Sequence, residues 1–182
     1  MARIIRTVNE KDLNRTLDFV ERVFTDSETA EDGKIVRNLL AEIRSKKYYL
    51  PELDLIMVDE NDELMGHVMF SRFHIEGKYE HEFLILTPVS VKTELQRQHI
   101  SKDLIEYGLE KARKMGYKFC MVEGNPLNYR PRGFVTSADY GIFAHESVGL
   151  PHPDCLMIQE LVPGALDGVH GYINYKFYES LS

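Results

Sequence analysis

The chain has 182 residues, of which 43% are hydrophobic and 28% charged, and its formal net charge is −7. This length and balance are typical of one globular domain with its own core, which we expect over residues 1–182. An acidic chain lacks the basic face that general nucleic-acid binding needs, and its field favours a cationic or neutral amine as ligand. No apolar segment is long enough for a signal peptide or a membrane span, so no membrane association is expected.

Cysteine usage indicates a reducing compartment. The two cysteines, Cys120 and Cys155, suggest no disulfide framework and fit no zinc pattern. Cys120 lies in the apolar run Tyr117–Val122, where a buried thiol acts as a small hydrophobe. We therefore expect a cytoplasmic protein.

A strand and then a helix are predicted at the N-terminus. Ile4–Val8 forms the strand, and Asn9 is a suitable N-cap for the helix. Asp12 stands at the third helical position, where a carboxylate favours the helix dipole. Helical spacing predicts that four apolar residues share the buried face: Leu13, Leu17, Val20 and Phe24.

The next segments change from a helical period to a strand period. A second helix is predicted over Glu31–Ser45, although Gly33 disfavours its first turn. Two short apolar runs joined by the polar turn Asp59–Glu63 then predict a β-hairpin. Phe73–Gly77 is expected to extend its second arm. The helix face is Ile35, Leu39, Leu40 and Ile43, and the hairpin arms are Leu53–Val58 and Leu64–Phe70.

A strand, a helix and a further strand follow. His81–Val91 is predicted as a strand in which Pro88 causes a bulge or a gap in the ladder. The helix begins near Ser101 and ends at Gly116, with Glu110 and Lys114 as an i,i+4 pair. Its predicted core face is Leu104, Ile105, Gly108, Leu109, Ala112 and Met115. Later strands are predicted at Tyr117–Glu123, Leu156–Val162 and Gly171–Phe177. This order predicts an α/β or α+β sheet with helices on both faces.

The stretch Leu86–Gly116 combines a buried strand, a polar loop and a helix N-terminus. Backbone N–H groups and the positive end of a helix attract anions, although this arrangement also occurs as plain architecture. Arg97 in the loop and Lys102 in the first helical turn favour an anion site. Pro88 would also splay the strand from its neighbour and expose backbone groups to an extended ligand.

Three motifs together resemble those of the GNAT N-acetyltransferases. The loop Gln96–Ser101 is similar to their acyl-CoA pyrophosphate loop, whose pattern is Q/R-x-x-G-x-G/A. Tyr129–Phe134 resembles the family signature Tyr-x-x-x-Gly-Phe. Met157–Leu166 resembles the tail of a bacterial subfamily of predicted N-acetyltransferases. The resemblance is best over Leu86–Leu166 and only general before it.

The resemblance implies a mixed β-sheet, splayed at its centre, that binds acetyl-CoA as co-substrate. The pantetheine arm would pair with backbone groups of Val89 and Val91. Tyr129 matches the tyrosine that protonates the departing CoA thiolate, a role that suits a phenol with its reference pKa of about 10. Packing beside a proline-rich turn is the alternative role for Tyr129. The pyrophosphate would meet N–H groups of Arg97, Gln98, His99, Ile100, Ser101 and Lys102.

The implied reaction is direct attack of a primary amine on the thioester, without a covalent enzyme intermediate and without a metal. The amine would belong to a small molecule or a peptide, and the resemblance leaves room for a homodimer. Two alternatives compete with this reading. One is a non-catalytic GNAT-like binding module with a degraded acyl-CoA site, and the other is a transferase that uses another acyl-CoA.

The loop departs from the family pattern at both glycine positions. His99 and Ser101 stand where the pattern has glycine. If position 99 has a positive φ, a side chain there costs about 1–2 kcal/mol. His99 would then either obstruct the pyrophosphate site or pair with a phosphate as an imidazolium. The hydroxyl of Ser101 suits a helix cap or a phosphate contact.

No general base stands out in the sequence. Glu82 lies on the predicted cofactor strand and Glu123 ends the strand beside it, but for each of them alone a solvent-facing charge is the favoured explanation. Three histidines, His145, His152 and His170, lie in segments that would line an acceptor pocket, although a lone loop histidine is more often incidental. The acceptor itself is not identified.

Overall fold

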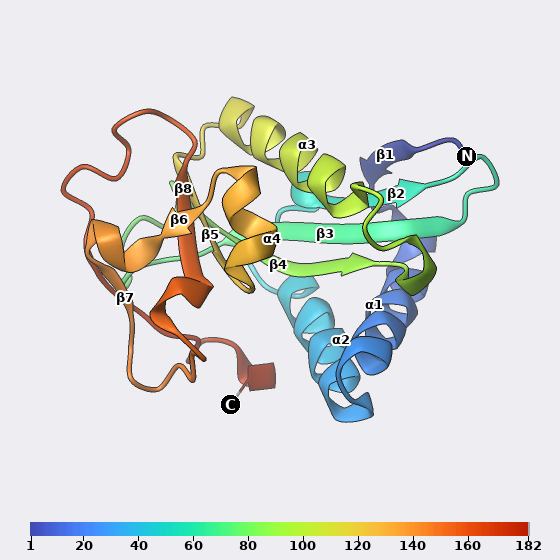
Figure 1. The fold of residues 1–182 in the computed structure, drawn as a ribbon, viewed down its shortest axis with the longest axis horizontal. Coiled ribbons are helices and arrows are strands. Elements are labelled where there is room, and N and C mark those ends of the chain that lie inside the picture. Colours follow the sequence, from blue (N-terminus) through green and yellow to red (C-terminus); the bar gives the residue numbers. More distant parts are fainter. Residues whose placement is uncertain (182) are drawn as a thin grey trace. The chain divides into compact units, whose positions relative to one another are not determined.

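The structure is a computed structural model that describes residues 1–181 (Figure 1). The predicted order of elements is confirmed as far as the third helix and the strand after it. Besides short 3-10 helices, four α-helices and nine strands are present among the described residues: β1 Ile4–Thr7, α1 Leu13–Ser27, α2 Ala30–Arg44, β2 Asp54–Val58, β3 Leu64–Arg72, β4 Phe83–Val91, α3 Ile100–Lys114, β5 Phe119–Glu123, α4 Pro126–Tyr129, β6 Val135–Thr136, β7 Ile142–Ala144, β8 Leu156–Glu160 and β9 Gly171–Ile173.

The chain divides into two compact units, each built from separate segments of the sequence. The first comprises Met1–Phe70, Thr87–Gly108 and Lys176–Ser182, and the second comprises Ser71–Leu86 and Leu109–Tyr175. Strands β3 and β4 and helix α3 therefore contribute residues to both units. A single domain over the whole chain stays a prediction.

The sheet of the first unit has the strand order β1-β2-β3-β4. β1 and β2 are antiparallel, and so are β2 and β3, which confirms the predicted hairpin. Phe73–Gly77 does not extend the second arm. β3 ends at Arg72, and Ile75 and Lys78 instead form an isolated bridge, because the chain turns back on itself there.

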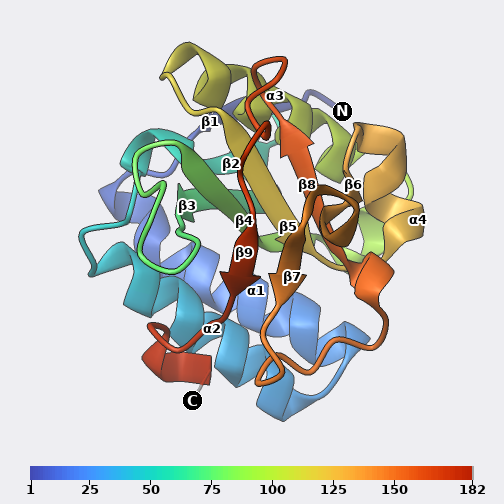
Figure 2. The same ribbon diagram turned by 90° about the vertical axis from the view of Figure 1, so that its left-hand side faces the viewer.

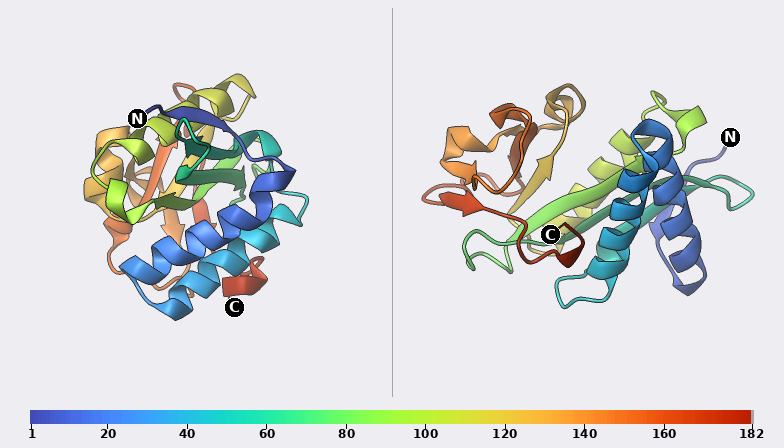
Figure 3. Two further views of the ribbon diagram at one scale, coloured as in Figure 1. Left: turned by 90° about the vertical axis from the view of Figure 1, so that its right-hand side faces the viewer. Right: turned by 90° about the horizontal axis from the view of Figure 1, so that it is seen from below.

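Helices cover both faces of the strands in the first unit. Figure 1 shows α1 and α2 on one side of β1–β4 and the beginning of α3 on the other, and Figure 3 shows α1 and α2 side by side. α3 approaches β3 closely at Gly66, where an added Cβ would lie 2.9 Å from the Ile100 side chain. The predicted mixed α/β class with a helix-flanked sheet is confirmed, and most neighbouring strands of the sheet are antiparallel.

The buried face of α1 differs from the predicted one. Leu13 is 38% exposed, and the residues that face the core are Thr16, Phe19, Val20 and Val23. Thr16 takes a core position because its hydroxyl donates to the Asp12 carbonyl oxygen at 2.8 Å, which satisfies the polar group inside the protein. On α2 the prediction holds for Leu39, Leu40 and Ile43, whereas Ile35 is 37% exposed.

The predicted N-cap at Asn9 is confirmed, at the short 3-10 helix Glu10–Asp12 that leads directly into α1. The Asn9 side chain accepts a hydrogen bond from the Lys11 N–H, and the Asp12 carboxylate accepts one from the Asn9 N–H at 2.9 Å. Asp12 is fully buried between Arg6 and Arg15. Burial would raise the pKa of Asp12, but the hydrogen bonds that it accepts hold that pKa well below its usual range.

A second buried carboxylate, Asp54, lies at the start of β2. His67 Nε2 lies 2.7 Å from Asp54 Oδ1, Arg44 Nε donates to Oδ2 at 2.9 Å, and the Tyr49 hydroxyl donates to Oδ2 at 2.7 Å. Burial alone would raise the pKa of Asp54, yet its bonds to His67 and Arg44 lower it to about 2. This network joins the end of α2 to strands β2 and β3.

The second unit has the strand order β4-β5-β8-β6 and a separate pair, β7 and β9 (Figure 2). β5 runs parallel to β4 through the pairs Phe83–Phe119, Leu84–Cys120 and Ile85–Met121, and antiparallel to β8. Cys120 is fully buried, as predicted, and burial raises the pKa of its thiol.

The predicted end of helix α3 is confirmed at Gly116, which has a φ of +97° and donates its N–H to the Arg113 carbonyl. Leu109 and Ala112 are buried as predicted, but Met115 is 39% exposed because it lies beyond the last helical residue, Lys114. Among residues 1–181, no helix is long and apolar enough to cross a membrane.

Candidate functional site

The loop before α3 has a left-handed backbone at position 99, the first of the two positions where the family pattern has glycine. Arg97 has a φ of +63° and His99 a φ of +66°, both in the left-handed region. The chain therefore adopts a positive φ at position 99 although the residue is not glycine. Histidine tolerates this region better than most residues, so the departure from the pattern preserves the shape of the loop at a modest cost.

The first turn of α3 begins directly after this conformation. The Asp103 N–H donates to the His99 carbonyl at 3.0 Å, which is the first hydrogen bond of the helical ladder. The N–H groups of Ile100 and Lys102 precede that ladder and have no carbonyl partner within the helix. Ser101 is helical, so its position requires no positive φ. The fan of N–H groups expected from the sequence stays a prediction.

The side chains around the loop are mostly exposed. Arg97, Gln98 and His99 are exposed, whereas Ile100 is buried and anchors the helix start. Lys102 lies in the first turn with its Nζ 3.9 Å from the Glu106 carboxylate, a weak surface pair. Two cations, Arg97 and Lys102, thus flank the N–H groups and would favour an anion there.

The strand that leads to the loop changes its burial pattern along its length. The first four residues of β4 are fully buried, and from Thr87 onward half-buried residues alternate with buried ones. Val89 and Val91 are half-buried, and Ser90 between them is only 2% exposed. The ladder with β5 consists of three pairs that end at Ile85. The part of β4 assigned to the pantetheine arm therefore lies beyond that ladder.

In the second unit, Tyr129 ends the short helix α4. Asn125 caps that helix by accepting the Leu127 N–H at 3.0 Å. The Tyr129 ring lies against Gly124, where an added Cβ would be 2.6 Å from the ring, and it meets Phe134 edge-on with 5.9 Å between the centroids. Gly133, with a φ of +93°, makes the turn between them. The residues of the Tyr-x-x-x-Gly-Phe motif thus pack together.

Burial raises the pKa of Tyr129 to about 12. A nearby cation, Arg132, opposes this shift but is the smaller effect. The phenol consequently keeps its proton throughout the neutral pH range. It is suited to donate a hydrogen bond to a developing anion, whereas the raised pKa makes it a weaker proton donor.

Two carboxylates proposed as bases have partners in the second unit. Glu82 lies 2.8 Å from Lys118 Nζ, so its carboxylate is paired with a cation. Glu123 is exposed and accepts a hydrogen bond from the Tyr175 hydroxyl at 2.7 Å. Sequence reasoning did not identify Tyr175, because 52 residues separate it from Glu123 and no motif links them.

Two of the three candidate histidines form hydrogen bonds within their own turns. His145 Nδ1 lies 2.8 Å from Ser147 Oγ, and His152 Nδ1 accepts the Asp154 N–H at 3.1 Å, so both stabilise their own turns. His170 is exposed. Within residues 1–181, no group of three or more His, Cys, Asp or Glu side chains is arranged to hold a metal ion.

A family model described as an acetyltransferase (GNAT) domain matches residues 4–136. The chain belongs to the GNAT acetyltransferase family. The uncharacterized N-acetyltransferase YjhQ of Escherichia coli (strain K12) is 30% identical over 126 residues, which are 68% of this chain and 69% of that protein. The uncharacterized N-acetyltransferase YhbS of the same strain is 25% identical over 68% of this chain and 71% of its own.

Solved structures of the family share the fold of this acetyltransferase. YhbS from Escherichia coli in complex with CoA has a TM-score of 0.81 at 22% identity, covering 95% of this chain and 89% of that one. A GNAT family acetyltransferase from Brucella melitensis in complex with acetyl-CoA has a TM-score of 0.74 at 23% identity, covering 100% and 99%. The predicted family and fold are thus confirmed.

Proposed function

We propose that this GNAT acetyltransferase transfers the acetyl group of acetyl-CoA to a primary amine of a small molecule or peptide. The observation that carries the proposal is the backbone of the loop before α3, where Arg97 and His99 have positive φ values. A left-handed residue directly before a helix N-terminus supports this proposal, because such turns leave neighbouring N–H groups free to bind an anion. CoA and acetyl-CoA in the related structures support the same assignment.

Acetyl-CoA supplies an activated thioester, and the residues of this chain would hold and orient it. N–H groups of Arg97, Gln98 and His99 and those at the start of α3 (Ile100, Ser101, Lys102) would bind the pyrophosphate. Backbone groups of Val89 and Val91, beyond the β4–β5 ladder, would pair with the pantetheine arm. Holding the cofactor along a rigid strand and a helix end fixes the thioester in place, which lowers the entropic cost of reaction.

Tyr129 is the proposed acid. The neutral amine attacks the thioester carbon, the carbon–sulfur bond breaks, and the sulfur leaves as a thiolate that needs a proton or a hydrogen bond. The Tyr129 phenol, with its pKa raised to about 12, remains protonated; the raised pKa disfavours full proton transfer to the sulfur and favours a hydrogen bond that stabilises the leaving thiolate. The attacking amine also loses a proton, and the carboxylates of Glu123 and Glu82 are the candidate acceptors of that proton.

The experiment is release of free CoA thiol in the presence of acetyl-CoA and a panel of primary amines. The Tyr129→Phe variant should lose about 100-fold in turnover while its affinity for acetyl-CoA changes little. Tyr172→Phe is the matched control, because Tyr172 is 52% exposed on β9 and has no proposed role. An undiminished rate in Tyr129→Phe would remove Tyr129 from catalysis. Tight acetyl-CoA binding with no thiol release from any amine would favour the binding-module alternative.

A further inference from the structure

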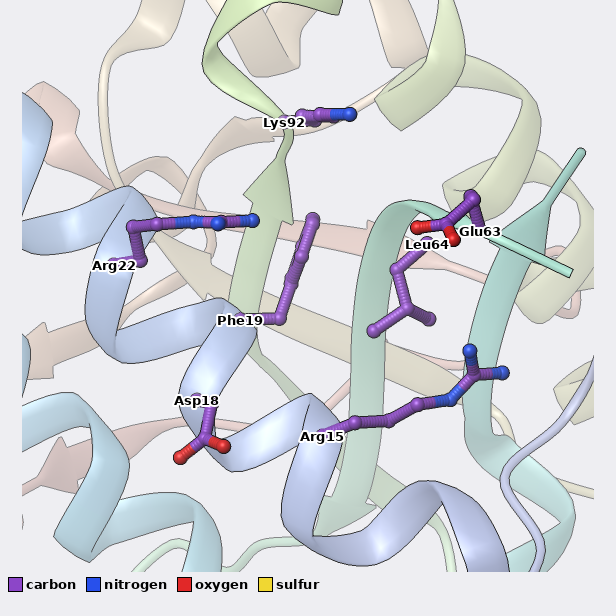
Figure 4. A pocket seen from close by; sticks show the side chains of 7 residues that line it. All are labelled: Arg15, Asp18, Phe19, Arg22, Glu63, Leu64 and Lys92. Carbon is purple, nitrogen blue, oxygen red and sulfur yellow. The ribbon is translucent and has the colours of Figure 1, made fainter.

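A pocket in the first unit lies on the side of α1 that faces the ends of β3 and β4 (Figure 4). Its volume is about 300 Å³, within the range of small-molecule sites. Phe19, only 3% exposed, and Leu64 give it an apolar floor. The charged residues that line it are Arg15, Asp18, Arg22, Glu63 and Lys92.

Two of these charged residues, Arg15 and Asp18, already form ion pairs with residues outside the pocket. Arg15 Nη2 lies 2.7 Å from the Asp12 carboxylate and 3.1 Å from that of Asp62. Asp18 accepts a hydrogen bond from Arg37 at 2.6 Å. Neither is available to a ligand without breaking an existing pair.

The other two cations are not paired. Throughout residues 1–181, neither Arg22 nor Lys92 has a carboxylate within ion-pair distance. Figure 4 shows the Phe19 ring pointing toward Lys92, with the Arg22 side chain beside it. The backbone at Lys92 is fixed, because its N–H donates to the Met65 carbonyl at 2.9 Å, and the Thr93 hydroxyl donates to Asp26 on α1 at 3.3 Å.

Two unpaired cations beside one apolar floor favour a ligand with both an anionic and an apolar part. A carboxylate between Arg22 and Lys92 would form charge-assisted hydrogen bonds with both. Glu63, also in the pocket, would oppose a second negative charge on the ligand. A monoanion therefore fits better than a phosphate ester, which carries nearly two charges at neutral pH.

We propose that this pocket binds a small monocarboxylate with an apolar body, its carboxylate between Arg22 and Lys92 and its body on Phe19 and Leu64. The proposal does not depend on the acetyl-CoA assignment, because it uses none of the residues from Gln96 to Lys102. It adds a second ligand site to this acetyltransferase.

The test is a calorimetric titration of 3-phenylpropionate into the full-length protein, with and without saturating CoA. The carboxylate should bind at least about tenfold more tightly than 3-phenylpropanol, its neutral match, and more tightly than phenyl phosphate. Arg22→Gln combined with Lys92→Gln should weaken binding about tenfold or more. Lys34→Gln, which removes an exposed cation of α2 outside the pocket, should leave it unchanged.

Several outcomes would overturn the proposal. They are no saturable binding at about 10 mM ligand, an equal loss in the Lys34 control, tighter binding of phenyl phosphate, and displacement of the ligand by CoA. Thermal melts of each variant check that it is folded. The melting temperature should change little, because neither Arg22 nor Lys92 has an ion-pair partner to lose among residues 1–181. If the unmodified protein did not bind acetyl-CoA, the proposed function would be refuted. The carboxylate titration would still test this pocket, because it does not require acetyl-CoA.

Discussion

The ring of Tyr129 meets Phe134 edge-on, with centroids 5.9 Å apart and ring planes at 84°. Phe134 is almost fully buried, so it restricts the Tyr129 ring, which also lies against the backbone at Gly124. Such edge-to-face pairs are worth about 0.5–1.5 kcal/mol beyond the area that they bury. The contact gives a physical reason for the spacing of the Tyr-x-x-x-Gly-Phe motif, since the aromatic residue after the turn positions the tyrosine.

Replacing Phe134 with leucine should therefore lower acetyl transfer about tenfold or more, because a mobile phenol is misplaced for proton donation. The affinity for acetyl-CoA should change less than about twofold, since Phe134 is not among the proposed cofactor residues. Steady-state rates and calorimetric titration of the variant check both statements. Phe143→Leu, at a ring that is 43% exposed, is the control. Equal rate losses in the two variants would argue against a positioning role for Phe134.

Position 99 of the loop should prefer glycine on conformational grounds alone. His99→Gly relieves the positive φ of +66° and should raise the free energy of unfolding by about 0.5–1 kcal/mol. Gln98→Gly, at a neighbouring exposed residue without a positive φ, should lower it or leave it unchanged. Denaturant unfolding of the two variants provides the comparison. If His99→Gly were as destabilising as Gln98→Gly, the left-handed conformation at position 99 would be wrong.

The same His99→Gly variant distinguishes the two roles of the side chain toward CoA. A marked gain in CoA affinity would indicate that the imidazole obstructs the site, whereas a loss would indicate that it pairs with a phosphate. Calorimetric titration of CoA measures the difference directly.

The buried Asp54 network should contribute strongly to stability at neutral pH. Asp54→Asn leaves the Arg44 guanidinium without its counter-charge and should cost about 3–5 kcal/mol. The folded-state pKa of Asp54 is lowered from 3.8 to about 2, so its stabilising effect is present above pH 3.8 and is lost as the pH falls toward 2. The stability difference from the variant should shrink over that interval. Asp18→Asn, at an exposed ion pair, should cost less than about 1 kcal/mol.

In the C-terminal segment of the first unit, three hydrogen-bond donors converge on one carboxylate. Glu42 accepts hydrogen bonds from the Glu179 N–H at 2.9 Å, the Ser180 N–H at 2.7 Å and the Ser180 hydroxyl at 2.6 Å. Glu42→Ala should cost about 1–3 kcal/mol and speed amide exchange at residues 179 and 180. Glu52→Ala, at an exposed side chain, should do neither. Unchanged exchange in Glu42→Ala would show that other contacts hold the segment.

Much of the fold could be predicted from the sequence because local patterns determine it. The cap at Asn9, the hairpin turn at Asp59–Glu63 and the end of α3 at Gly116 depend on neighbouring residues alone. The predictions are wrong where contacts between residues far apart in the sequence determine the local structure. Thr16 replaces an apolar residue in the core because Asp12 satisfies its hydroxyl, and β3 ends at Arg72 where the chain turns back.

In the candidate site too, contiguous motifs could be predicted from the sequence, whereas contacts between distant residues could not. The loop Gln96–Ser101 and the Tyr129–Phe134 motif are contiguous in sequence and were recognisable there. The partnership of Glu123 with Tyr175, the Asp54 network and the pocket around Phe19 join residues far apart in the chain, and no local pattern reveals them. The sequence alone does not predict the left-handed backbone at His99, because histidine, unlike glycine, does not by itself indicate a positive φ.

Calorimetric titration of acetyl-CoA into the unmodified protein tests the central claim most directly. The N–H groups at the start of α3 and the left-handed loop predict saturable, one-site binding with a Kd well below about 1 mM. Arg97→Gln should weaken it, and Lys34→Gln should not. An absence of binding at about 1 mM acetyl-CoA would contradict the assignment of this loop as the cofactor site.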